Sequence, residues 1–373
     1  MVNIVEVKTK KDIKKFVDFP TGLYKGVKQY VHPLRMDEFN NFNPKKNASF
    51  EDCEAVYFLA YKEGKLVGRI AGILQKLYNA KVNEKRVRFT RFDCINDVEV
   101  AQALFKSVED WAKSIGMDTV HGPMGFNDLD REGMLIEGFD EIATFEEAYN
   151  YDYYKDLMVA CGYEKEVDWV EYNITMPKQI DEKFTRVADL VQKKYNLRSA
   201  EKKGKKAFIK KYAPGIFKLL DEAYGSLYGV VPYTDKVRQQ VIDQFNMFIS
   251  LDFMSMVLDE NDDVIAFGFA IPSLSEVVNK YEGRLTLCSL PKLLKAVKKP
   301  TQLDLALIAV KPEYQAKGAS SLVFTEMIEN FIKRGIKTCE TNLNLETNVQ
   351  VMAQWKYFDS EQHKRRRSYI KKI

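Results

Sequence analysis

The chain repeats one order of expected elements twice, and this repeat constrains its fold more than any other feature. Two apolar runs flank a turn at residues 62–65, and the same hairpin pattern recurs around residues 260–263. Each hairpin is followed, after an insertion, by a strand, a loop, an apolar-striped helix closed by a glycine, and another strand. The closing glycines are Gly116 and Gly335. We therefore expect one α/β (α+β) unit used twice.

The repeat predicts two domains. A chain of 373 residues is long enough for two or three. The segment most typical of a linker is 176–181, where Pro177 separates a strand from a helix. We place the domains at 1–178 and 179–373, each a mixed central sheet flanked by helices and each ending in a strand, at 167–176 and 364–373.

Composition argues against several other classes. Lys and Arg number 57 against 53 Asp and Glu, and a surplus of +4 is too small to indicate a dedicated nucleic-acid binder. The five cysteines are widely spaced and the three histidines show no zinc-type spacing, so we expect neither disulfides nor a metal. No signal peptide or long apolar run is evident. We expect a cytoplasmic protein without a membrane or nucleic-acid partner.

The second loop, residues 310–320, has the composition of an anion cradle. Gly318, Ala319 and Ser320 are small enough to let a ligand approach the backbone. The free N–H groups and the dipole of the following helix both favour an anion there. No Walker loop or G-x-G-x-x-G motif is present. We expect a phosphate or diphosphate at this turn; the alternative is a plain strand-to-helix connection.

These residues resemble the acyl-CoA-binding motif of the GNAT superfamily of N-acetyltransferases, Q/R-x-x-G-x-G/A after a strand. Gln315, Gly318 and Ser320 take its fixed positions, with Ser320 replacing the usual Gly or Ala. The resemblance covers nearly the whole chain, and residues 121–128 and 137–140 resemble a little-characterised bacterial subgroup. It implies two tandem GNAT-like domains, with acetyl-CoA or another acyl-CoA held by the second.

The resemblance also implies roles for individual residues. The main chain of the strand before the loop positions the thioester, and an Asn on the next loop contacts the cofactor. Asn348 matches that Asn, although its position is equally typical of a helix N-cap. The expected cofactor-binding residues are Ile308, Ala309, Val310, Gln315, Ala316, Lys317, Gly318, Ala319, Ser320 and Asn348.

The general acid and base are harder to assign. In the family a tyrosine protonates the leaving thiol, but Trp355 stands at that position and has no phenolic proton. Tyr357, close by, is our candidate acid. Asp304, which opens the strand, is our candidate base, with Glu340 on the next strand as an alternative.

The first half differs at the matching loop. Aligning the halves on their closing glycines places Asn96 opposite Gln315 and Glu99 opposite Gly318, with Asp97 also in the loop. Carboxylates at a helix start repel a diphosphate and occupy the positive end of the helix dipole. We therefore expect the first domain to lack the cofactor and to shape a substrate cleft or support the fold.

Two further clusters allow two interpretations each. The tyrosines of residues 149–154 either line a substrate pocket or pack over a core. The basic runs 202–206 and 363–367 indicate either a contact to nucleic acid or to an adenosine phosphate, or else a solvated helix face and an exposed terminal strand. The small net charge favours the second interpretation.

The sequence thus predicts an acyl-CoA-dependent N-acyltransferase that transfers acetyl to a small-molecule or peptide amine. One alternative is a catalytically silent protein that binds acyl-CoA or scaffolds a partner, which Trp355 favours. Another is a Fem-like aminoacyl transferase, which also has two GNAT-like domains but requires contact with an aminoacyl-tRNA.

Overall fold

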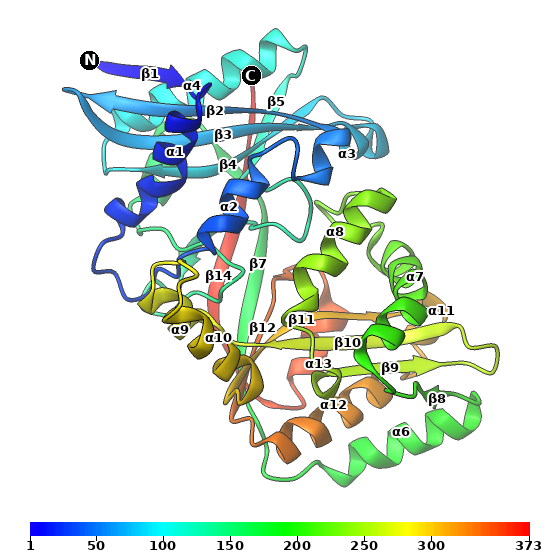
Figure 1. The fold of residues 1–373 in the computed structure, drawn as a ribbon. Helices are drawn as coiled ribbons and strands as arrows, with labels where there is room; N and C mark the ends of the chain where they lie inside the picture. The colour runs from blue at the N-terminus through cyan, green and yellow to red at the C-terminus, as the bar shows by residue number, and fades with distance from the viewer.

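The computed structural model describes residues 1–373, and its first half is a sheet with helices on both faces (Figure 1). Its strands are β1 (Val2–Glu6), β2 (Cys53–Lys62), β3 (Lys65–Gln75), β4 (Arg86–Cys94), β5 (Thr119–Gly122), β6 (Met134–Glu137) and β7 (Glu164–Thr175). Its helices are α1 (Lys10–Leu23), α2 (Arg35–Asn41), α3 (Lys76–Val82), α4 (Val98–Ser114), α5 (Tyr154–Ala160) and the short 3₁₀ helix η1 (Ala48–Glu51).

The second half repeats this order of elements. Its strands are β8 (Arg198–Ser199), β9 (Met254–Leu258), β10 (Val264–Pro272), β11 (Gln302–Val310), β12 (Thr338–Thr341), β13 (Asn344–Leu345) and β14 (Asp359–Lys372). Its helices are α6 (Glu182–Lys194), α7 (Lys205–Tyr224), α8 (Asp235–Asn246), α9 (Ser275–Lys280), α10 (Ser289–Lys298), α11 (Pro312–Gln315), α12 (Ser320–Arg334), α13 (Val349–Trp355) and the 3₁₀ helix η2 (Leu251–Phe253).

Alternation along the strands places helices on both faces of each half. In β2, Val56, Phe58 and Ala60 pack in the cluster that contains α4, whereas Tyr57 and Leu59 pack in the cluster that contains α1. The second half is built likewise, with α12 and α6 in one core cluster and α7 in another. The helices α4 and α12 end next to the two predicted glycines, both of which have positive φ angles.

The two halves share one 14-stranded sheet, and their terminal strands are exchanged. The order along the sheet is β1-β2-β3-β4-β5-β14-β7-β12-β11-β10-β9-β8. The last strand of the second half therefore lies between β5 and β7, and the last strand of the first half lies beside β12. Figure 1 shows β7 and β14 side by side, running from one half to the other. The boundary at residue 178 stays a prediction, because the sheet continues unbroken across both halves.

The pairing of β7 with β14 is long and antiparallel, from Asp359 opposite Thr175 to Ile370 opposite Glu164. Three of its side chains form a buried ionic cluster with Glu340 of β12. Glu171 accepts from Arg366 Nε at 2.6 Å and lies 3.2 Å from Lys364 Nζ, and Lys364 also contacts Glu340. Lys364, Arg366 and Glu171 are each 1% exposed or less. Burial of these charges is tolerated because each has an opposite partner.

This cluster corrects the expected exposure of the terminal strand. Lys364 and Arg366 are buried, while Arg365 and Arg367 face the other way and pair with Asp168. The run is therefore neither a solvated edge nor a free basic patch.

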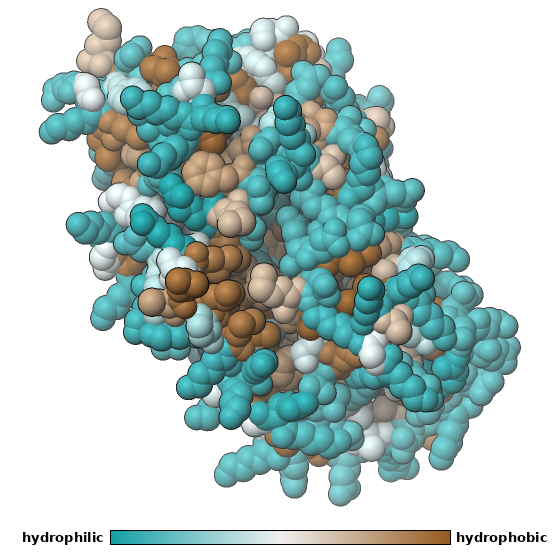
Figure 2. Space-filling view, viewed as in Figure 1, coloured by the Kyte–Doolittle hydropathy of each residue, from teal (hydrophilic) through white to brown (hydrophobic).

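The outer surface is mostly hydrophilic in the view of Figure 2, with scattered apolar atoms and a group of them over α9 and α10. No helix combines the length and the hydrophobicity required to cross a bilayer.

Candidate active site

The site begins where two parallel strands of the second half diverge. β11 pairs with β12 only from Gln302–Thr338 to Leu305–Thr341. Beyond this point β11 continues to Val310. The segment that follows β12 turns away instead and pairs with β7 through β13. The edge of β11 that faced β12 is thus left without a partner strand over residues 306–310.

The open edge presents backbone groups in alternation. The Tyr224 hydroxyl donates to the Ile308 carbonyl at 2.6 Å, and Gln315 Nε2 donates to the Val310 carbonyl at 3.1 Å. Both carbonyls therefore point away from β10. The N–H and C=O groups of one strand residue point to the same edge, so the N–H groups of Ile308 and Val310 face the opening. Ala309, the residue between them, pairs with Phe267 of β10 instead.

The loop after β11 is shaped by Gly318, which has a φ of +80°. Its carbonyl accepts from Ser321 N at 2.9 Å and from Ser321 Oγ at 2.7 Å, which fixes the turn. The N–H groups of Ala319 and Ser320 donate to no protein atom, and no side chain caps α12. Ala316 and Lys317 are exposed on the same loop. Ala319 is fully buried and Ser320 is half-buried, so the turn offers an anion the Ser320 amide and the dipole of α12.

The matching loop of the first half is occupied by its own side chains. Asp97 caps α4, and its carboxylate accepts from Glu99 N at 3.0 Å and Val100 N at 3.3 Å. The hydroxyls of Tyr153 and Tyr154 also bond the main chain of Cys94 at the end of β4. The tyrosine cluster therefore packs over the core, as one of the two interpretations expected, and covers the edge that corresponds to the open edge of β11.

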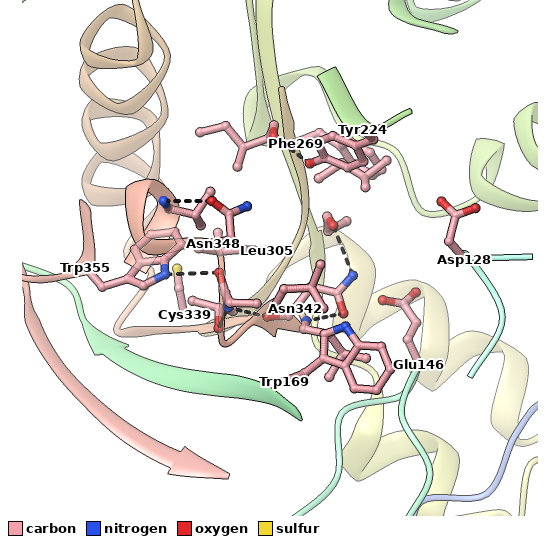
Figure 3. A pocket seen from close by; sticks show the side chains of 18 of the residues that line it. Asp128, Glu146, Trp169, Tyr224, Phe269, Leu305, Cys339, Asn342, Asn348 and Trp355 are labelled. Carbon is pink, nitrogen blue, oxygen red and sulfur yellow. Dashed lines mark hydrogen bonds between the residues drawn. The ribbon is translucent and has the colours of Figure 1, made fainter. Parts of the chain in front are cut away.

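A cavity of about 200 Å³ opens between the diverging strands (Figure 3). Of its 33 lining residues 24 are hydrophobic, so most of it accepts an apolar group. Consecutive residues Leu305 to Ile308 all line it. Because consecutive strand residues point to opposite faces, the cavity passes through the sheet. Trp355 lies at one end, with Phe324 packed against it, and Tyr224 and Phe269 lie at the other.

Polar side chains hold the diverging segment in place. Asn342 donates to the Ala306 carbonyl at 3.2 Å, and Trp355 Nε1 donates to Asn344 Oδ1 at 3.2 Å. Asn348 caps α13 through Val351 N at 3.3 Å and also lines the cavity. Trp355, where the sequence resemblance predicted a tyrosine, is thus a buried structural donor.

Four carboxyl groups from the first half face the same cavity, and the sequence reasoning missed them. They belong to Asp128, Glu132, Glu146 and Glu147. Figure 3 shows Asp128 and Glu146 across the cavity from Trp355 and Asn348. Burial raises the pKa of Glu146 to about 7, and it raises the pKa of Glu132 well above the ordinary value. The spacing of these acids in the sequence is typical of a solvated loop, and it gave no signal of a shared cavity.

The structure brings neither predicted catalytic residue to the cavity. Asp304 is 4% exposed, lies outside the cavity lining, and has no hydrogen-bond partner on either oxygen. Burial and then Glu340 raise the pKa of this carboxyl well above its usual range. Tyr357 is 74% exposed and packs edge-on against Phe184. Their assignments as base and acid therefore have no support from position.

The fold has a solved counterpart. A solved tandem GNAT protein from the clavulanic acid biosynthesis pathway matches with a TM-score of 0.58 and 10% identity, over 100% of this chain and 98% of that one. The chain has the tandem GNAT fold, as its sequence predicted.

Two relatives match by sequence. Protein YghO of Escherichia coli (strain K12) is 26% identical over 378 residues, which cover 98% of this chain and 94% of the relative. The bacterial ceramide synthase of Caulobacter vibrioides (strain NA1000 / CB15N) is 25% identical over 326 residues, which cover 84% of this chain and 82% of the relative. No protein-family model matches the chain.

Proposed function

We propose that this protein is an acyl-CoA-dependent N-acyltransferase whose donor site lies in the second half. The observation that carries the proposal is the open edge of β11, which points two N–H groups into an apolar cavity and ends at a turn with free amides. Such an edge and turn suit a thioester carbonyl and a diphosphate respectively. When bound, acyl-CoA supplies an activated acyl group.

The residues of this chain would divide the work along the donor. The N–H group of Ser320 at the start of α12 binds the diphosphate, and Gly318 keeps the turn free of side chains. The N–H groups of Ile308 and Val310 orient and polarise the thioester. The reaction forms a C–N bond and breaks the C–S bond of the thioester, and the proton that the amine loses ends on the released thiol.

The lining favours an acyl group longer than acetyl. Of the 33 residues that line the cavity, 24 are hydrophobic, and an acetyl group is too small to bury much of this apolar surface. A relative named bacterial ceramide synthase supports the same choice, because a ceramide is an N-acylated long-chain amine. We therefore propose an apolar acyl chain, in place of the acetyl group that the family resemblance implies.

The proposal is tested by combining the protein with acyl-CoAs from acetyl to palmitoyl and a panel of primary amines. Thiol release and amide detection by mass spectrometry measure transfer, and calorimetry measures donor binding. We expect release to depend on both substrates and to increase with acyl length. Donor binding without transfer to any amine would favour the silent acyl-CoA-binding alternative. No donor binding at all would refute the proposal.

A further inference from the structure

Two of the four carboxyl groups in the cavity are buried, and the other two, Asp128 and Glu146, are half-buried. Glu132 is 7% exposed and Glu147 is 5% exposed, and each has an oxygen that receives no hydrogen bond, although Glu147 lies 3.9 Å from Arg366 Nε. Glu146 makes no hydrogen bond or ion pair. Asp128 is held by the Tyr233 hydroxyl at 2.7 Å and by Val231 N at 3.2 Å. Buried carboxyl oxygens without donors cost stability, which indicates that a ligand supplies the missing donors.

The four carboxyl groups indicate the chemistry of that ligand. A ligand that donates hydrogen bonds and carries positive charge suits this set, because a nearby cation lowers the carboxyl pKa values that burial raises and makes the groups ionised acceptors. The fold holds no group of three or more His, Cys, Asp or Glu arranged to bind a metal ion. A protonated amine meets both requirements, and a hydrocarbon chain attached to it would share the apolar lining of the cavity with the acyl chain of the donor.

We infer that Asp128, Glu132, Glu146 and Glu147 form the acceptor site, which binds a primary alkylammonium, and that Glu146 takes the proton that frees its nitrogen. The first half thereby supplies the acceptor site and the second half the donor site. The inference deepens the proposed function and rests on it for the transfer step, but not for amine binding.

Glu146 suits the role of base for two reasons. Its carboxyl is free of hydrogen bonds, so it can accept a proton without breaking one. Its pKa of about 7 lies near neutral pH, where a general base is most efficient. The titratable and charged groups that act on it are Arg131, Glu147 and Asp304.

Amine binding is measured by calorimetry in the absence of any acyl-CoA. Octylamine and 1-octanol serve as probes of equal chain length with and without charge. We expect octylamine to bind about tenfold or more tightly than octanol, as a charged hydrogen bond allows. The double variant E132Q/E146Q loses this preference, whereas Glu137→Gln, an exposed acid of the same segment, retains it. Equal binding of the two probes to wild type, or an unchanged preference in the double variant, would overturn the acceptor site.

The proton-transfer role has its own readout. Wild-type turnover should rise as pH passes about 7, and Glu146→Gln should abolish that rise while its acyl-CoA affinity stays unchanged. An unchanged pH profile in Glu146→Gln would overturn the role of Glu146 as base. If wild type binds octylamine selectively but binds no acyl-CoA, the proposed function fails and the acceptor site stands.

A separate surface carries a second inference. Four exposed leucines lie within ten residues around α10, namely Leu285, Leu287, Leu290 and Leu294, and Leu287 is 93% exposed. Figure 2 shows apolar atoms gathered over α9 and α10. Lys295, Lys298 and Lys299 are also exposed there, and none of them forms an ion pair. The other face of the helix is anchored in the core through Leu293.

We infer that this surface docks on an anionic lipid bilayer. Leucines surrounded by unpaired lysines have the composition of an interfacial helix, in which the apolar side chains enter the headgroup region and the lysines meet lipid phosphates. The charge complementarity favours a lipid surface over a second copy, which would bring these lysines against one another.

Vesicle co-sedimentation tests the docking. We expect the protein to sediment with phosphatidylglycerol–phosphatidylcholine vesicles, less so with phosphatidylcholine alone, and less at high salt. L287E/L290E and K295E/K298E should each remove most of the binding, while Val159→Glu, on the exposed face of α5, should not. Vesicle binding that survives L287E/L290E would overturn the inference. So would a dimer, seen by light scattering, that L287E/L290E dissociates.

Discussion

Replacing Gly318 with Asp tests the donor site through charge alone. A Cβ at this position would lie 3.4 Å from Val191 Cγ2, an ordinary contact, so a side chain fits. The φ of +80° disfavours most residues, but Asp and Asn tolerate it better than others. Gly318→Asn is therefore a matched control, because it has the same shape and backbone strain without the charge.

The magnitude follows from Coulomb's law. A carboxylate roughly 5 Å from one charge of a diphosphate, at an effective dielectric constant of about 20, costs about 3 kcal/mol. This penalty corresponds to about a 100-fold loss of affinity for coenzyme A relative to Gly318→Asn. The difference between the two variants should shrink as salt is added, because the turn is open to solvent.

Calorimetric titration of coenzyme A into both variants and wild type measures the effect, and thermal unfolding confirms that both variants are folded. If Gly318→Asp and Gly318→Asn bind coenzyme A equally, the diphosphate does not lie at this turn, and our reading of the free amides is wrong.

Three predictions concern stability. Glu171→Gln should lower the unfolding free energy by about 3–5 kcal/mol, because Arg366 and Lys364 lose a buried counter-charge, whereas exposed Glu361→Gln should change it little; urea titration measures both. Asp304 has a raised pKa in the folded state, so it keeps its proton where the unfolded chain has lost it, and wild-type stability falls as pH rises above the usual range of a carboxyl. Asp304→Asn should therefore gain stability relative to wild type as pH rises above the ordinary pKa of a carboxyl, and a difference that stays constant with pH would contradict this sign. Asp97→Ala should cost about 1 kcal/mol through the lost cap of α4, while Asp97→Asn should recover most of it; no loss in the Ala variant would show that the cap is unimportant.

The sequence was sufficient for features that depend on local pattern. The two hairpins, the helices that end at Gly116 and Gly335, and the acidic cap at Asp97 all follow from turn chemistry, periodicity and capping. The Gly318 turn followed from its small residues in the same way.

Features that depend on partners distant in the sequence escaped prediction. The alternation of residues in a strand does not determine which strand lies beside it, so the sequence did not predict the exchange of β7 and β14. Lys364 and Arg366 looked solvated because their burial depends on Glu171 and Glu340, which lie on other strands. Glu146 looked like an ordinary loop acid because its surroundings come from the other half of the chain.

The exchange of terminal strands has a consequence for how this protein is made. The ribosome completes β5 at Gly122 and β7 at Thr175, yet the strand that lies between them begins only at Asp359. During that interval β5 lacks a partner on one edge and β7 lacks partners on both, because every strand that pairs with β7 belongs to the second half, and these edges are open to wrong pairing with other chains. Neither half can therefore complete its part of the sheet until β14 has been synthesised, and the two halves fold as one cooperative unit.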